Sequence, residues 1–468
     1  MIMKPSLLNR VLKNAWLAVA LAAIAASQES CKSYLEIPPP TTDLTRTTVF
    51  SDASSVEATV NGLYTLTFID INFWSYAPHF YGGMMADELY PRSVNVFDDL
   101  LFNQYNPSTD TYGKFWQNGY KVIYHANSII TGLADVTFLP EILHKRYIAE
   151  AKFFRAYIYL LLSGYYGDVP LITTTDIKET DSAPRSPKAA VIALVVADLK
   201  DVIADLSRMD MPKTRVNALA AQSLLARVYL YSQQWEEAAA AATAAIAGNA
   251  RLESALDSVF LRSSDETIWT ISSSGSRPDQ GDRTTYGLML LPSPTNLNYG
   301  LPKSLYNSFE PGDKRRSTWI GIFAVSPDTI LFTAKYKQKS TNMGPMLAED
   351  DVVMRLAEQY LIRAEANAAM GKTSESAADL NVLRRRAGLR DLPSDMRKEQ
   401  LVLQVEKERR AELFVEGHRW FDIVRTGRAN AVFGAAKPAT WKPHAVLLPI
   451  PQAEMDLNQN LVQNPGYQ

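Results

Sequence analysis

Apolar residues recur at helical spacing along much of the chain. The longest such pattern ends at Gly164 and Gly167, with Pro170 beyond them, which is the usual chemistry of a helix end. Its apolar side chains recur mostly three or four residues apart and so share one helix face: Tyr147, Ala151, Phe154, Ile158, Leu161 and Leu162. The pattern predicts a long helix that packs on the protein core.

Two shorter patterns between residues 217 and 246 predict a pair of antiparallel helices. The polar residues 232–234 separate them. Large and small residues follow the spacing of tetratricopeptide repeats: Leu225, Ala226, Tyr229, Ala238 and Ala245. Small side chains let two helices approach closely, so we interpret these residues as packing rather than chemistry.

Further helices are predicted on both sides of this pair. Their ranges are 53–66, 112–135, 187–206, 353–371 and 374–387. Pro187 suits the first turn of its helix, and Ser374 is a candidate N-cap. Because the helix pairs lie far apart in the sequence, the pattern differs from that of a continuous solenoid. The predicted fold class is mostly α, with tetratricopeptide-like helix pairs.

Two long stretches interrupt the helical patterns, at about residues 70–111 and 251–350. Both lack sustained helical periodicity and are rich in Gly, Pro, Asn, Ser and aromatic residues. Irregular segments of this length commonly carry function or have structure of their own. We therefore expect a large, loop-rich ligand-binding region to be built from them.

The first thirty residues have the order of a secretory signal. Basic residues come first, an apolar run from Trp16 to Ala26 follows, and small and polar residues lead to Cys31. A permanent transmembrane helix is the alternative, but a bilayer span needs roughly 20 apolar residues, which is more than this run supplies. We assign residues 1–30 to a signal peptide.

Cys31 is the single cysteine of the chain, so an internal disulfide is excluded. Its place directly after the signal predicts lipidation, as in bacterial lipoproteins. Ser30 fits that pattern, whereas Gln28 and Glu29 depart from it; a stray cysteine in the leader is the alternative. We expect residues 31–45, which include three consecutive prolines, to form an extended tether, and residues 46–468 to form the domain.

Composition narrows the possible functions. With 48 basic and 50 acidic residues, the formal net charge is −2, which provides no field that attracts nucleic acid. The 22 tyrosines and 8 tryptophans are generous, and such side chains serve both cores and ligand-stacking surfaces. Nucleic acid is therefore not an expected partner.

Enzyme signatures are missing from the sequence. The five histidines are scattered without a pair four residues apart, and neither a phosphate-binding loop nor a G-x-S-x-G motif occurs. The sequence thus predicts no metal site, no cofactor and no catalytic residues. A glycosidase pair of carboxylates stays open, because its members need to be close only in space.

The densest polar cluster lies in residues 406–422. On a helix, Glu408, Glu412 and Glu416 share one face and repel one another unless cations intervene. The nearest candidates for those cations are Arg409, Arg410 and Arg419. The cluster is either a carboxylate–arginine active site or a buried ion network that docks the helix on its neighbours, and we favour the network.

Several motifs resemble those of the SusD/RagB family of outer-membrane nutrient-binding lipoproteins. They follow the family's order along nearly the whole chain, at residues 61–64, 149–171, 355–366 with 381–388, 408–429 and 447–467. The resemblance implies a SusD-like body of four tetratricopeptide-like helix pairs, with a looped region that carries the ligand site.

The resemblance also implies a function. Such proteins are lipid-anchored at the outer membrane, exposed on the cell surface, and bind oligosaccharides or, in some members, peptides without cleaving them. Their partner is a SusC-like TonB-dependent outer-membrane transporter, to which they deliver the nutrient. An exported glycan hydrolase and a tetratricopeptide scaffold for protein partners are the alternatives.

Ligand residues differ among such proteins, so we predict them from the pattern of aromatic and polar residues. Sugars present apolar faces that stack on aromatic rings and hydroxyl groups that need donors and acceptors. The predicted ligand-binding residues are Trp74, Tyr90, Arg92, Asn95, Phe97, Asp98, Tyr286 and Tyr299. Packing of the same aromatic rings onto the helices is the alternative for each of them.

Overall fold

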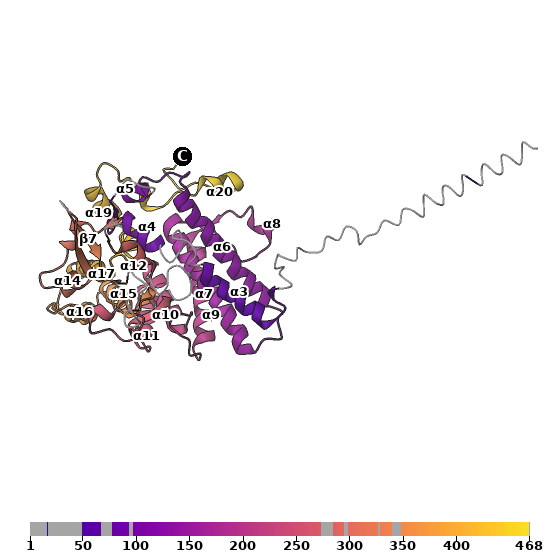
Figure 1. Ribbon diagram of the computed structural model, residues 1–468, viewed down its shortest axis with the longest axis horizontal. Coiled ribbons are helices and arrows are strands. Elements are labelled where there is room, and N and C mark those ends of the chain that lie inside the picture. Colours follow the sequence, from indigo (N-terminus) through magenta and orange to yellow (C-terminus); the bar gives the residue numbers. More distant parts are fainter. Residues whose placement is uncertain are drawn as a thin grey trace, which may run out of the picture. The chain divides into compact units, whose positions relative to one another are not determined.

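The computed structural model describes Trp16 and residues 49–66, 77–92, 97–272, 284–293, 298–325, 328–338 and 348–467. The unit Ala53–Gln468 is built around a series of long helices (Figure 1). Their bounds are α3 (Ala53–Leu66), α6 (Asp110–Leu133), α7 (Glu141–Tyr166), α9 (Lys188–Leu206), α10 (Ala218–Tyr231), α11 (Trp235–Ile246), α15 (Leu356–Ala369), α16 (Thr373–Arg386) and α17 (Lys398–Leu413). The predicted mostly α fold is confirmed.

The long helices pack on one another largely in chain order. Helix α6 contacts α7, α7 contacts α9, α9 contacts α10, and α10 contacts α11. Helix α11 then packs on α15, although residues 247–355 separate the two in the sequence, and α15 contacts both α16 and α17. The helix series is therefore interrupted in the sequence but continuous in space.

The predicted late helix pair needs two corrections at its boundaries. Helix α15 begins at Leu356, because Val353 belongs to a strand, β8 (Asp351–Arg355). Helix α16 begins at Thr373 with Lys372 as its N-cap, so Ser374 lies inside the helix and is not the cap. A strand that pairs with a distant partner leaves no trace in helical periodicity.

Four short antiparallel strand pairs occur among the described residues. They are β1 (Tyr90–Pro91) with β5 (Tyr299–Gly300), β2 (Val169–Pro170) with β3 (Arg185–Ser186), β4 (Thr267–Ile271) with β8, and the hairpin of β6 (Ile320–Val325) with β7 (Asp328–Thr333). The region 251–350 therefore has a hairpin and paired strands that the sequence did not predict.

Short helices occupy most of the remaining connections. They are α4 (Ala77–Met85), α5 (Asp98–Phe102), α8 (Ile177–Thr180), α12 (Thr285–Leu290), α13 (Lys303–Tyr306), α14 (Lys314–Trp319), α18 (Arg419–Arg425), α19 (Ala429–Ala436) and α20 (Gln452–Leu457), with 3₁₀ turns η2 (Leu256–Ser258) and η4 (Pro443–Val446). Five of these short helices fall in the two segments predicted to be loop-rich.

Buried ion pairs join neighbouring long helices. Arg155 on α7 meets Asp198 on α9 with two contacts of 2.8 Å. Arg227 on α10 meets Glu358 on α15 at 2.6 and 2.7 Å. Paired, parallel N–H···O bonds of this kind fix orientation as well as distance. Charge pairs as well as apolar packing therefore fix how neighbouring helices are positioned.

Candidate functional site

The strands β1 and β5 bring predicted ligand residues from both irregular regions to one place. Pro91 lies opposite Tyr299 in the register, and the Arg92 backbone N–H donates to the Asn298 carbonyl at 2.9 Å. Tyr90 is half-buried and Arg92 is exposed. We call this group, Tyr90 to Arg92 with Asn298 to Gly300, the β1–β5 edge.

Gly300 lies in close contact with the Tyr90 ring. A Cβ atom placed on Gly300 would lie 2.6 Å from Cζ of Tyr90, closer than any packed carbon atoms approach. The ring of Tyr90 therefore lies close against Gly300 of the opposite strand. This contact fixes the tyrosine at the edge while part of its surface remains open to solvent.

The segment that leads into β1 is pinned to the charged centre of the protein. Asp87 has a left-handed backbone, with φ of 56°, which turns the chain after α4. Glu88 is buried, and its Oε2 accepts the backbone N–H of Val415 at 2.9 Å. Lys437 pairs with Asp87 at 2.8 Å. The edge is thus held on a rigid support rather than at the tip of a free loop.

Phe97 and Asp98 lie at the start of α5. The Phe97 ring is half-buried, 5.9 Å from the ring of Tyr81, and Asp98 is the first helical residue. Asn103 ends the helix in a left-handed conformation and donates to the hydroxyl of Tyr105 at 2.8 Å. Both predicted residues therefore sit on a short, firmly ended helix.

Tyr286 and Tyr299 belong to a buried aromatic group. Tyr286 is only 2% exposed and stacks on Tyr336 with 4.9 Å between ring centroids. Tyr299 is 7% exposed and meets Phe80 edge-on at 5.4 Å. The rings of both tyrosines are used in packing, which was the alternative considered for them. The hypothesis of ligand contact therefore rests on the more exposed residues of the predicted set.

Three further predicted residues, Trp74, Asn95 and Cys31, lie outside the described residues. Their predicted roles, ligand contact for the first two and lipidation for the third, stay predictions.

The predicted acidic ladder lies at the centre of a buried ion network, but α17 ends at Leu413, so Glu416 lies beyond the helix and the three glutamates do not share one helix face. Arg355 Nη1 contacts Glu412 at 2.7 Å and Glu266 at 2.8 Å, and its Nε contacts Glu416 at 2.7 Å. Arg315 Nη1 lies 3.0 Å from Glu408 and 3.1 Å from Glu412. The interpretation as a docking network is therefore confirmed.

The electrostatics agree with a structural role for this network. Burial would raise the pKa of the Glu412 carboxyl, but the surrounding guanidinium groups, Arg386 first, hold it well below its usual range. Burial lowers the pKa of the Lys335 ammonium to about 8, although Glu416 opposes the shift. Glu412 is fully buried and stays ionised, so it has neither the proton nor the access that a general acid needs.

The cations that neutralise the ladder are not the ones that the sequence suggested. The observed partners come from distant segments: Arg315, Lys335, Arg355, Arg384 and Arg386. Of the three nearby arginines, Arg409 pairs with Asp422 at 2.7 Å instead. Arg410 and Arg419 form no ion pair within the described part of the chain. Proximity in sequence gave the wrong partners because the ladder faces other elements.

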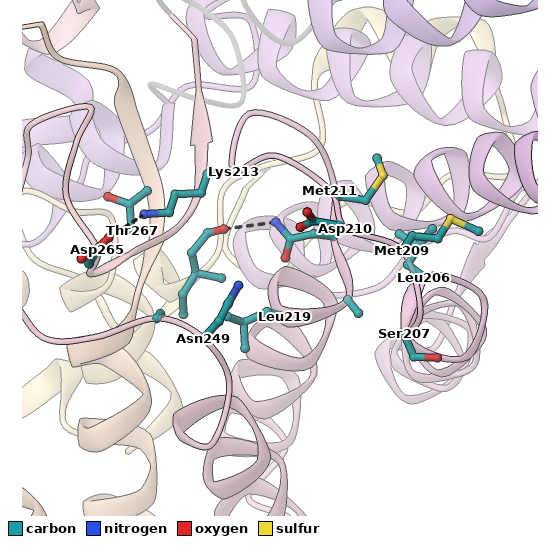
Figure 2. A pocket seen from close by; sticks show the side chains of 14 residues that line it. Leu206, Ser207, Met209, Asp210, Met211, Lys213, Leu219, Asn249, Asp265 and Thr267 are labelled. Atoms are coloured by element: carbon teal, nitrogen blue, oxygen red, sulfur yellow. Dashed lines mark hydrogen bonds and ion pairs between the residues drawn. The ribbon is translucent and has the colours of Figure 1, made fainter.

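A cavity of about 350 Å³ lies where the end of α9, the start of α10 and the start of β4 meet (Figure 2). Lys213 donates to the Ser264 carbonyl at 2.6 Å, and Asn217 donates to the Ile268 carbonyl at 3.2 Å. Asn217 also caps α10 by accepting the Ala220 N–H at 2.8 Å. Because these polar groups already hold the α9–α10 connection in place, we assign the cavity a structural role.

Two family models match the chain. The model described as "SusD family" matches residues 324–467, and the one described as "Starch-binding associating with outer membrane" matches residues 33–230. The chain belongs to the SusD/RagB family. The motifs singled out in the sequence at 408–429 and 447–467 fall in the first match, and those at 61–64 and 149–171 fall in the second.

Relatives of the SusD type extend over most of the chain. It is 25% identical to SusD-like protein P38 of Formosa agariphila, over 83% of this chain and 87% of the relative. It is 28% identical to SusD-like protein P2 of the same organism, over 75% and 80%. A laminarin-binding SusD-like protein of known structure matches with a TM-score of 0.76 and 25% identity, covering 89% of this chain and all of that one.

Two features are absent from the described residues. No helix among them has the length and apolar character to cross a membrane. Nor do they contain a group of three or more His, Cys, Asp or Glu side chains that could hold a metal ion.

Proposed function

We propose that this SusD-family protein binds an oligosaccharide at the bacterial cell surface, held to the outer membrane by a lipid on Cys31, and passes the ligand to a TonB-dependent transporter. The observation that carries this proposal is the match over 89% of the chain to a protein that binds laminarin. The family model named for starch binding at the outer membrane supports the same class of ligand.

The β1–β5 edge and the start of α5 form the proposed primary site. Tyr90 offers part of an aromatic ring, Arg92 an exposed guanidinium group, and Asp98 a carboxylate at a helix start. Aromatic faces stack on sugar rings, while arginine and carboxylate groups pair with hydroxyl groups. The support from Glu88 and Gly300 holds these groups in place before the ligand arrives, which reduces the entropic cost of binding.

Binding without cleavage is favoured over an exported hydrolase. The densest carboxylate cluster is buried and neutralised by arginines, so it has no route to a glycosidic bond. A glycosidase needs one carboxylic acid and one carboxylate on opposite sides of its substrate, about 5–10 Å apart. The charged core of this protein instead joins helices.

A glycan array tests the proposal directly. The purified protein is applied to plant, algal and host polysaccharides and, in parallel, to a peptide panel. We expect retention on at least one polysaccharide with no release of shorter sugars. Release of products would identify a hydrolase, and binding to peptides alone would overturn the oligosaccharide assignment.

A further inference from the structure

Helix α6 carries an aromatic stripe on a face that the proposed primary site does not use. Trp116, Tyr120 and Tyr124 follow one another at intervals of four residues, so they lie on one side of the helix. Two adjoining hollows of about 380 and 470 Å³ run along this stripe and share Trp116, Tyr120 and Glu454. In Figure 1 the helices α3, α8 and α20 lie around α6.

The hollows have an aromatic floor. The rings of Trp116 and Tyr120 lie 5.1 Å apart, and the Tyr120 hydroxyl donates to the Pro170 carbonyl at 2.8 Å, which fixes that ring. Tyr124 is 55% exposed and, within the described part of the chain, forms no hydrogen bond. Tyr124 differs from a singly exposed aromatic residue because it lies beside Trp116 and Tyr120 on the wall of a hollow, where its ring is open to a ligand.

Polar groups line the rims of both hollows. Glu454 accepts a hydrogen bond from Gln117 at 3.0 Å through Oε1, and its Oε2 has no hydrogen-bond partner among the described residues. Lys121 lines one hollow, and Asp181 and Asn458 line the other. The combination of an apolar, aromatic floor with a few polar groups at the edge is typical of small-ligand sites.

We propose that the trough formed by these two hollows, the α6 trough, is a second binding site for a segment of oligosaccharide. Sugar rings stack on the exposed ring of Tyr124 and contact the partly exposed Tyr120, which packs on the buried Trp116, and their hydroxyl groups pair with Glu454 and Lys121. The inference rests on the proposed function and extends it. None of the lining residues comes from β1, β5 or α5, so the trough is separate from the primary site.

Two sites on one rigid body bind a long polysaccharide more tightly than a short sugar, because binding at one raises the effective concentration at the other. The trough therefore predicts a preference for long chains. It also predicts that removal of either site leaves measurable binding at the other.

The experiment uses affinity gels that contain laminarin, soluble starch or any polysaccharide retained in the array. Tyr124→Ala and Glu454→Ala are compared with wild type and with Phe138→Ala, a matched control because Phe138 is also an exposed aromatic residue, 48% exposed, but lies outside the trough. We expect about tenfold weaker retention for Tyr124→Ala, no change for Phe138→Ala, and an unchanged Tm for both.

The double variant Arg92→Ala with Tyr124→Ala separates the two proposals. We expect each single variant to keep partial binding and the double variant to lose it. Wild-type retention by Tyr124→Ala and Glu454→Ala would overturn the α6 trough while leaving the proposed function intact. A wild-type protein that binds no polysaccharide would overturn both.

Discussion

Glu412 is the carboxylate on which the buried charges converge. It is fully buried and contacts Arg315, Arg355 and Arg386. Removal of one partner from such a network leaves the others charged and desolvated, at a cost of about 3–5 kcal/mol. We therefore expect Glu412→Ala to lower the free energy of unfolding by about that amount, as measured by urea denaturation.

Arg410 provides the contrast, because it is close to Glu412 in sequence and has no ion pair among the described residues. Burial, followed by the neighbouring Arg419, lowers the pKa of Arg410 to about 10, which indicates a cation in an unfavourable place. We expect Arg410→Met to change the free energy of unfolding by less than about 1 kcal/mol. A loss as large as that of Glu412→Ala would show that Arg410 belongs to the network.

Glu349 makes stability depend on pH near neutrality. Burial raises the pKa of this carboxyl to about 7. The backbone N–H groups of Lys337 and Gln338, which donate to it at 2.8 and 3.1 Å, oppose this shift because they stabilise the carboxylate. The folded state thus retains a proton that the unfolded chain has already released, so this contribution to stability is complete below pH 4.5 and is lost as the pH rises through 7. Between pH 5 and 8, we expect the free energy of unfolding of Glu349→Gln to fall by about 2–3 kcal/mol less than that of the wild type. Parallel stability–pH curves for the variant and wild type would contradict the assignment.

Arg92 and Phe97 test the primary site with little disturbance of the fold. Arg92 is exposed and bonds to Asn298 through its backbone N–H, so Arg92→Ala removes the guanidinium group and keeps this bond. We expect Arg92→Ala and Phe97→Ala to weaken glycan binding by about tenfold in calorimetry, with Tm nearly unchanged for Arg92→Ala. Phe102→Ala on the same helix is the matched control, since Phe102 is 44% exposed. Normal binding by both variants would place the site elsewhere.

At the scale of single residues, the sequence identified the charged ladder but not its partners. Glu408, Glu412 and Glu416 were evident from their spacing of four. Their cations lie 57 to 97 residues away in the cases of Arg355 and Arg315, so no local pattern could reveal them. Burial also depends on distant residues: Tyr90 and Tyr286 look alike in sequence, but the rings of His79, Phe80 and Tyr336 pack around Tyr286.

At the scale of elements, long helices were predictable and strands were not. Helices α3 and α9 lie within a residue of their predicted ranges, because an amphipathic helix carries its periodicity locally. Val353 of strand β8 was assigned to a helix because its pairing with β4 depends on a partner 80 to 88 residues away. The same dependence on distant segments explains why the contact of α11 with α15 was missed.

Arg185 ties the C-terminal segment to the helical body. Its guanidinium group donates to Val462 and Asn464, both at 2.6 Å, and to the Asp168 carbonyl at 2.8 Å. We expect Arg185→Ala to accelerate amide hydrogen exchange in residues 447–467, since local opening becomes easier by about 1–3 kcal/mol.

Arg251→Ala is the control for this prediction. Among the described residues, the Arg251 side chain donates to the nearby carbonyls of Gly248 and Ala250, so its loss leaves the C-terminal segment in place. Unchanged exchange in residues 447–467 of Arg185→Ala would show that the apolar contacts of the segment are sufficient to hold it.

At the scale of the whole molecule, the charged network supports the fold, while the irregular segments carry the proposed ligand residues. The network joins α14, α16, α17 and β8 into one support, and the Glu88 contact connects the β1–β5 edge to it. Such a division allows ligand residues to differ between relatives while the support stays the same. It also explains why the motifs at 355–366 and 408–429 predicted the family but not the ligand.

The proposed attachment to the membrane depends on one atom, the sulfur of Cys31. A single acyl chain gives only reversible binding, whereas two or more chains anchor a protein stably, at about 0.8 kcal/mol per buried methylene group. We expect Cys31→Ser to move the protein from the membrane fraction to the soluble fraction of cells that lack the partner transporter. Ser30→Ala keeps the thiol and a small residue before it, so it should remain with the membrane. A Cys31→Ser protein that stays in the membrane fraction of those cells would contradict lipidation at this position, because the chain has no second thiol that could carry the lipid.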